Sequence, residues 1–162
     1  MEATQSTPVH LACEQGSLHL LEMMANIQPD RFCNALTNPD KKDYEGYTPV
    51  QRASLLNAPT LLKFLVEKGG SVKDEDPNGK TLSVLHLAAS TGAWGNVDYL
   101  LKDCQLDPFE TNAFSGRHLT HEAAIGGMNL SECASFVEYL ELVSMSSSIY
   151  ISKVKQLKLR KN

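Results

Sequence analysis

Apolar residues along this chain recur at intervals of three and four positions, which is the spacing of one face of an α-helix. Four segments show this pattern and are predicted to be helices: residues 18–25 (LHLLEMMA), 60–70 (TLLKFLVEKGG), 96–103 (NVDYLLKD) and 133–142 (CASFVEYLEL). Helices this short cannot bury their apolar faces alone, so neighbouring elements must cover them. The pattern therefore predicts an all-α chain in which short helices pack against one another.

A second, shorter motif precedes each of these segments. Its four copies are TPVHLAC at 7–13, TPVQRAS at 48–54, SVLHLAA at 83–89 and HLTHEAA at 118–124. Threonine can cap a helix, and proline at the first helical position costs little because its missing N–H has no partner there. The fourth positions, His10, Gln51, His86 and His121, recur at separations of 41, 35 and 35 residues. Each copy also carries a small residue that lets two short helices approach closely: Ala12, Ala53, Ala88 and Ala123.

This motif resembles the signature of the ankyrin repeat family, T-P-L-H-x-A, which recurs about every 33 residues. A glycine follows the motif in three copies, at Gly16, Gly92 and Gly126. A polar turn containing glycine precedes the last three copies, at residues 44–46, 77–79 and 114–116. Because several independent positions keep one register, the resemblance implies an ankyrin-repeat solenoid of about four helix-turn-helix units joined by hairpin-like loops.

The resemblance also sets the expected domain organisation. An ankyrin repeat domain is expected over residues 1–142, with repeats at about 5–37, 46–75, 79–110 and 114–142. The segment 27–42 is rich in Asn, Asp and Pro and is predicted to be an inserted loop. The fourth repeat has an irregular signature and a long link between its helices, so it is expected to be distorted. Residues 143–162 are Ser-rich and then basic, and they are predicted to form a disordered tail.

Within this family, the middle of the chain is similar to the cytoplasmic ankyrin region of transient receptor potential ankyrin-type (TRPA) cation channels. The segments that carry the similarity are QRASLL at 51–56, LLKFLVEKGGSV at 61–72, HLAAS at 86–90 and NVDYLL at 96–101. The resemblance implies a fragment or short isoform of such a channel, with ion transport and sensory transduction belonging to the whole channel. The chain departs from that family because it has no pore and no apolar run near the ~20 residues of a membrane span. The alternative is a free-standing soluble adaptor or inhibitor that masks a partner protein.

Charge and cysteine usage refine the expected surroundings. Residues 1–142 hold nineteen acidic and ten basic side chains, a net charge of −9, whereas the remaining five basic residues lie at 153–161. We therefore expect no nucleic-acid partner, and membrane contact only indirectly or weakly through the basic tail. The four cysteines form no C-x-x-C pair, and residues 1–10 lack the features of a signal peptide. These features favour free thiols and a cytoplasmic location, at the cytoplasmic side of a membrane if the chain is part of a channel.

The sequence contains no recognisable catalytic constellation. The nucleophile-elbow, zinc-protease, phosphate-loop and dinucleotide-binding motifs are all missing. His10, Gln51, His86 and His121 occupy one position of successive repeats, so they cannot share a metal ion and are expected to be structural. We therefore expect no enzymatic activity, no cofactor and no metal site.

Binding of a protein partner is the expected function, since stacked repeats present an extended concave surface made of turn tips and first helices. Exposed Tyr, Phe and Arg are the residue types that anchor interfaces. The candidate partner-binding residues are Tyr44, Glu45, Tyr47, Arg52, Asp74, Glu75, Asp76, Asn78, Phe114 and Arg117. The acidic run at 74–76 would favour a basic partner. Candidate partners include other channel subunits and repeats of the same array.

Overall fold

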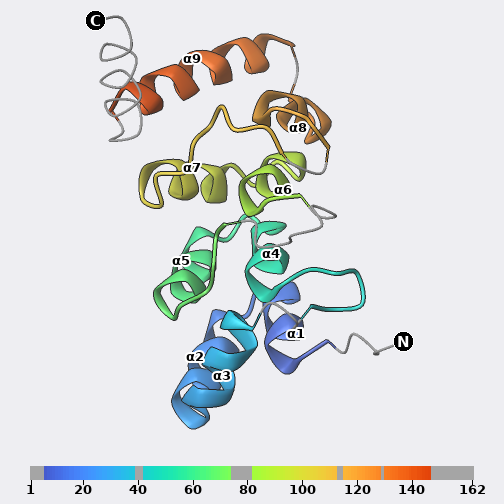
Figure 1. Ribbon diagram of the computed structural model, residues 1–162, viewed down its shortest axis with the longest axis vertical. Coiled ribbons are helices and arrows are strands. Elements are labelled where there is room, and N and C mark those ends of the chain that lie inside the picture. The colour runs from blue at the N-terminus through green and yellow to red at the C-terminus, as the bar shows by residue number, and fades with distance from the viewer. Residues whose placement is uncertain (1–5, 39–41, 74–81, 113–114, 129, 147–162) are drawn as a thin grey trace, which may run out of the picture.

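A computed structural model describes residues 6–38, 42–73, 82–112, 115–128 and 130–146. Within these ranges the chain consists of helices and connecting turns, without strands. The helices are α1 (Pro8–Glu14), α2 (Leu18–Ile27), α3 (Pro29–Thr37), α4 (Pro49–Ser54), α5 (Pro59–Glu67), α6 (Val84–Ser90), α7 (Trp94–Lys102), α8 (Leu119–Ile125) and α9 (Leu130–Ser146). Four pairs, α1–α2, α4–α5, α6–α7 and α8–α9, are stacked in chain order (Figure 1), and we number them repeats 1 to 4. The predicted all-α solenoid of stacked helix pairs is confirmed.

The start of each repeat is determined by local hydrogen bonds. The Thr48 hydroxyl accepts a hydrogen bond from the Gln51 N–H at 3.3 Å, and the Gln51 side chain accepts one from the Thr48 N–H at 2.9 Å. This reciprocal capping box satisfies N–H groups that have no partner inside the helix. After α1 the chain turns at Gly16, whose φ of +67° suits a residue without a side chain. Helix α1 is thereby limited to about two turns before α2 begins.

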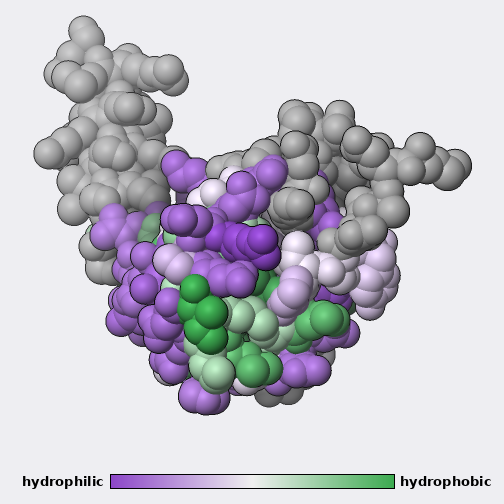
Figure 2. Space-filling model, turned by 90° about the horizontal axis from the view of Figure 1, so that it is seen from below, coloured by the Kyte–Doolittle hydropathy of each residue, from purple (hydrophilic) through white to green (hydrophobic). Residues whose placement is uncertain are grey.

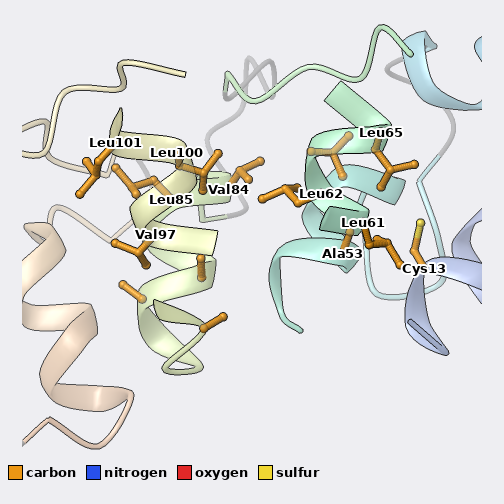
Figure 3. Close-up of a cluster of buried hydrophobic side chains, with 14 of the residues drawn as sticks. Cys13, Ala53, Leu61, Leu62, Leu65, Val84, Leu85, Val97, Leu100 and Leu101 are labelled. Atoms are coloured by element: carbon orange, nitrogen blue, oxygen red, sulfur yellow. The ribbon is translucent and has the colours of Figure 1, made fainter. Parts of the chain in front are cut away.

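Packing between the repeats depends on small and branched apolar residues. Ala53, Ala88 and Ala123 are completely buried where the short first helices meet. In α5, Leu61 lies beside Cys13 of repeat 1, whereas Leu62 points toward Val84 of repeat 3 (Figure 3). Each inner repeat is therefore covered from both sides, as expected of a solenoid.

The segment predicted to be an inserted loop, residues 27–42, differs from that expectation. Residues 29–37 form helix α3, which begins at Pro29 and buries Phe32, Ala35 and Leu36. The Phe32 ring packs edge-on against Phe64 of α5, with 6.1 Å between ring centroids. Apolar residues at spacings of three and four give this segment a helical face, which the surrounding Asn, Asp and Pro residues concealed in the sequence.

The last helix also runs beyond the predicted boundary. α9 spans Leu130–Ser146, so the helix begins before residue 133 and continues past residue 142 into the serine-rich stretch. The rest of the predicted tail, residues 147–162, lies outside the described residues. In the described ranges, none of the helices has the length and apolar character needed to cross a membrane.

Candidate protein-interaction surface

A compact turn, residues 43–47, precedes α4 and projects to one side of the stack (Figure 1). Its two ends are joined by a hydrogen bond from the Asp43 N–H to the Tyr47 carbonyl at 2.9 Å. The Asp43 carboxylate accepts two more, from the N–H groups of Glu45 at 3.0 Å and Tyr47 at 2.9 Å. Gly46 has a φ of +87°, which glycine adopts without strain. The backbone of this turn is therefore held in one conformation.

Arg52, on α4, fastens this turn to its helix. Its Nε donates to Asp43 Oδ2 at 2.7 Å, a second guanidinium nitrogen bonds the same oxygen, and that nitrogen also lies 2.7 Å from Glu45 Oε2. The guanidinium carbon lies 4.9 Å from the ring centroid of Tyr47 and 5.7 Å from that of Tyr44. Burial alone would lower the pKa of Arg52, but the hydrogen bonds and charges of Asp43 and Glu45 outweigh it and raise that pKa.

The predicted site residues in this turn divide into an outer and an inner group. Tyr44 is 64% exposed and Glu45 is exposed, as a contact surface requires. Tyr47 is half-buried, and Arg52, expected to project from its helix, is only 8% exposed. Arg52 is covered because Asp43 neutralises it and two tyrosine rings lie over it. It therefore positions the turn from inside.

Asp43 is the central acceptor of this turn and, unlike an exposed contact residue, is almost completely buried. The only sequence signal for this role is the place of Asp43, just before the glycine turn and nine residues before an arginine, Arg52.

Repeat 4 has a related turn in which the charges are exchanged. Glu122 occupies the position of Arg52 and is buried, while the exposed Arg117 of the turn lies 3.7 Å from its carboxylate. Ser115 donates a hydrogen bond to Glu122 at 3.4 Å, and its N–H donates to Asn112 Oδ1 at 2.9 Å. Here the exposed side chain is a cation, whereas the exposed charge at the turn before α4 is the anion Glu45.

The fourth position of the motif links consecutive repeats. His10 receives a hydrogen bond from the Thr7 N–H at Nδ1, at 3.2 Å, so its Nε2 carries the proton and donates to the Tyr47 carbonyl of repeat 2 at 3.1 Å. Gln51 likewise donates from Nε2 to the Leu82 carbonyl ahead of repeat 3 at 3.3 Å. These bonds are those expected of structural residues.

The same position in the last two repeats differs in its exposure. His86 is buried and its Nδ1 lies 2.7 Å from the Ser83 hydroxyl. His121, by contrast, is exposed, and its Nδ1 accepts from the His118 N–H at 3.3 Å. Across the described residues, His, Cys, Asp and Glu do not gather in groups of three or more that could hold a metal ion.

The described cysteines are free thiols with different surroundings. Burial raises the pKa of Cys13 to about 12, so this thiol stays protonated and packs as a small apolar residue. Cys104 is half-buried, and its pKa is also raised by burial. Cys33 is exposed on α3.

Half of the candidate binding residues cannot be compared with the structure. Asp74, Glu75, Asp76, Asn78 and Phe114 lie outside the described residues. The structure brings Tyr44, Glu45 and Tyr47 of one turn together with Arg52 of α4, and it places Arg117 in the separate turn of repeat 4.

Part of the chain is similar in sequence to a known protein. Over 99 residues the chain is 35% identical to transient receptor potential cation channel subfamily A member 1 of Drosophila melanogaster. The alignment covers 60% of this chain but 8% of that protein, so the chain spans less than a tenth of the relative it matches. The similarity supports the ankyrin-like resemblance. A scan against protein-family models gave no match.

A solved structure shares the fold. It is a chain of the crystal structure of the yeast ribosomal protein Rps3 in complex with its chaperone Yar1, with a TM-score of 0.59. The match covers 74% of this chain and 82% of that chain at 22% sequence identity. At that identity the likeness concerns the fold alone.

Proposed function

We propose that this chain is a protein-binding module, related to part of the cytoplasmic N-terminal ankyrin region of TRPA-type cation channels. The 35% identity over 99 residues supports that relationship for a segment of the channel. The proposed role is recognition of a partner protein in the cytoplasm, and catalysis forms no part of it.

The fixed turn at residues 43–47 is the observation that carries this proposal. An exposed loop normally loses conformational freedom when it binds, and that loss weakens binding. Here the two backbone hydrogen bonds to Asp43 and its ion pair with Arg52 have already ordered the turn. The turn thus presents Tyr44, a large exposed aromatic side chain, on an ordered backbone, and tyrosine is enriched among the residues that anchor interfaces.

Charge indicates what the partner would present to this turn. Glu45 is exposed beside Tyr44, and residues 1–142 carry a net charge of −9. A partner with a cationic group close to an apolar one would pair with Glu45 and pack on Tyr44. Arg117, exposed in repeat 4, would contact an acidic group of the same partner.

Quantitative affinity capture from the native cell tests this proposal with a matched pair of variants. Tyr44→Ala removes the exposed ring, whereas Lys63→Ala truncates an exposed side chain on the outer face of α5. We expect the Tyr44→Ala variant to capture several-fold less of the partner than the wild-type chain does, and the Lys63→Ala variant to capture as much. The helicity of both variants should be unchanged. Loss with Lys63→Ala alone would place the interface on the opposite side of the stack.

A further inference from the structure

The N-terminal end of the stack carries an apolar surface. Viewed along the stack from this end, hydrophobic residues form a patch bordered by hydrophilic ones (Figure 2). A groove of about 720 Å³ lies here between α1, α2 and α3, and its lining includes Leu20, Met23, Met24 and Ile27. Leu20 is 39% exposed, Met23 43% and Ile27 69%. Apolar patches that stay exposed on a folded protein commonly mark interaction sites.

The repeat register shows what covers the position of Leu20 elsewhere in the molecule. Leu20 corresponds to Leu61 in repeat 2 and to Asn96 in repeat 3, which are 1% and 0% exposed. Leu61 lies beside Cys13 of the preceding repeat (Figure 3), and Asn96 donates to the Ala53 and Ser54 carbonyls of its preceding repeat at 3.3 and 3.2 Å. The position of Leu20 is therefore a stacking position that contacts the repeat before it.

A second position of the first repeat is likewise exposed where its equivalents in the other repeats are buried. Pro8 is exposed, whereas its equivalents Pro49, Val84 and Leu119 are all buried. At these two positions, the N-terminal end is thus a stacking surface that is left uncovered.

The C-terminal end of the stack exposes the complementary surface. His121 is exposed, but its equivalents in repeats 1 to 3 are all buried, and those of repeats 1 and 2 bond a carbonyl at the start of the next repeat. Ala124 is also exposed, whereas its equivalents Cys13, Ser54 and Ala89 are completely buried. One chain therefore carries both halves of the junction that joins its own repeats.

We infer that this chain associates head to tail with a second copy of itself, the His121–Ala124 end of one copy covering the groove at Leu20 of the other. Ala124 would contact Leu20 as Cys13 lies beside Leu61 within one chain. His121 would donate to the Ser6 carbonyl, because Ser6 holds the position of Tyr47 and Leu82, whose carbonyls bond the equivalent residues. A second copy is the occupant that the repeat register specifies, since it supplies side chains at the same repeat positions as those that fill the internal junctions.

This association uses the two ends of the stack and leaves the turn at residues 43–47 free, so it stands apart from the proposed partner binding. A head-to-tail contact joins two different surfaces, so it does not close on itself as a symmetric dimer does. Chains would then add one after another, and the average mass would keep rising with concentration.

Sedimentation analysis of the full chain and two complementary variants tests the inference. Leu20→Asp blocks the N-terminal end and Ala124→Glu blocks the C-terminal end. We expect the wild-type chain to exceed twice the 17.8 kDa monomer mass at high concentration, and each variant alone to stay monomeric. An equimolar mixture of the two variants retains one intact junction, so it should form a dimer and nothing larger.

Asn26→Asp is the matched control, because it introduces the same charge at an exposed position of α2 that does not line the groove. It should associate like the wild-type chain. Circular dichroism checks that each variant keeps its helicity, and Met23→Asp replaces Leu20→Asp if that variant unfolds. A wild-type chain that stays monomeric at every concentration overturns the inference, and so does a mixture of the two variants that forms no dimer.

Discussion

The buried ion pair between Asp43 and Arg52 fixes the conformation of the exposed turn before α4. Arg52 and Asp43 are both nearly inaccessible to solvent, and each satisfies the other while the aromatic rings of Tyr44 and Tyr47 lie near the guanidinium. Taking two charges out of water is costly, and the cost is recovered only when hydrogen bonds are nearly complete. The two N–H bonds to Asp43 meet that condition. The main effect of the Asp43–Arg52 pair is thus to hold the turn in one conformation.

Removing the cation should therefore be strongly destabilising. Arg52→Met leaves the Asp43 carboxylate buried without its counter-charge, and we expect the free energy of unfolding to fall by about 3–5 kcal/mol. Asp43→Asn together with Arg52→Met should cost much less than the sum of the two single changes, because no isolated charge remains. Urea titration of the four proteins measures this coupling. Strictly additive losses would show that the two side chains are independent.

Asp98 makes the stability of the fold depend on pH. Its hydrogen bond to Lys102, and a second one from the Tyr139 hydroxyl, lower the pKa of Asp98 below its ordinary value. A lowered folded-state pKa stabilises the fold above the unfolded-state pKa of about 3.9, and that stability is lost as pH falls through the folded-state value.

Asp98→Asn should therefore be less stable than the wild-type chain near neutral pH. Because Asp98 and Lys102 are half exposed, we expect a difference below about 1 kcal/mol. Denaturant titration at several pH values measures it. The difference should shrink as pH falls below 3.9, and a gap that widens on acidification would refute the assignment.

Among the elements, α3 lies outside the regular repeat and links repeats 1 and 2. It buries Phe32 against Phe64 of α5, so it adds a contact that the helix pairs alone would not make. The helix pairs and the structural role of position four followed from the sequence because the motif keeps one register over four copies, each with alanine at its sixth position. Helix α3 did not, because its Pro, Asp and Asn residues are equally typical of a loop.

Burial of Arg52 was likewise hidden in the sequence. Its partner Asp43 lies nine residues away, and the two approach each other only once the glycine turn has formed. Repeat 4, which has a related turn, carries an anion, Glu122, at the position of Arg52, so comparing the repeats does not reveal the pairing.

Phe32→Ala tests whether α3 is an integral element. Phe32 is almost completely buried, so the loss of its ring should lower the free energy of unfolding by about 3–5 kcal/mol. Arg31→Ala, on the exposed side of the same helix, should change it by less than about 0.5 kcal/mol. Thermal or urea unfolding measures both. Equal, small effects would mean that α3 is a detachable appendage.

For the molecule as a whole, stacking distributes stability unevenly. Repeats 2 and 3 are covered on both sides, while repeats 1 and 4 leave stacking residues such as Leu20 and Ala124 exposed. Solenoids gain much of their stability from contacts between neighbouring repeats, so the end repeats should unfold most readily. The exposed ends and the fixed turn are different surfaces, so self-association and partner binding can occur together.

The tail provides a test at this scale. Truncation after Ser146 removes residues 147–162 with their five basic side chains but leaves α9 entire. We expect the melting temperature to change by no more than a few degrees, because the tail lies outside the repeat register. Binding to vesicles of anionic lipid should fall, since each cation near such a surface contributes about 1 kcal/mol. Aggregation of the truncated chain would instead identify the tail as a cap on repeat 4.

Photo-crosslinking from position 44 tests the proposed binding function most directly. A photoreactive amino acid placed at Tyr44, in the fixed turn, would sample whatever protein lies against this surface in the native cell, and the same group at Lys63 would sample the outer face of α5. We predict a discrete covalent adduct with a partner protein from position 44 and none from position 63. Adducts from position 63 alone, or none from position 44, would contradict the proposal that this turn is the binding surface.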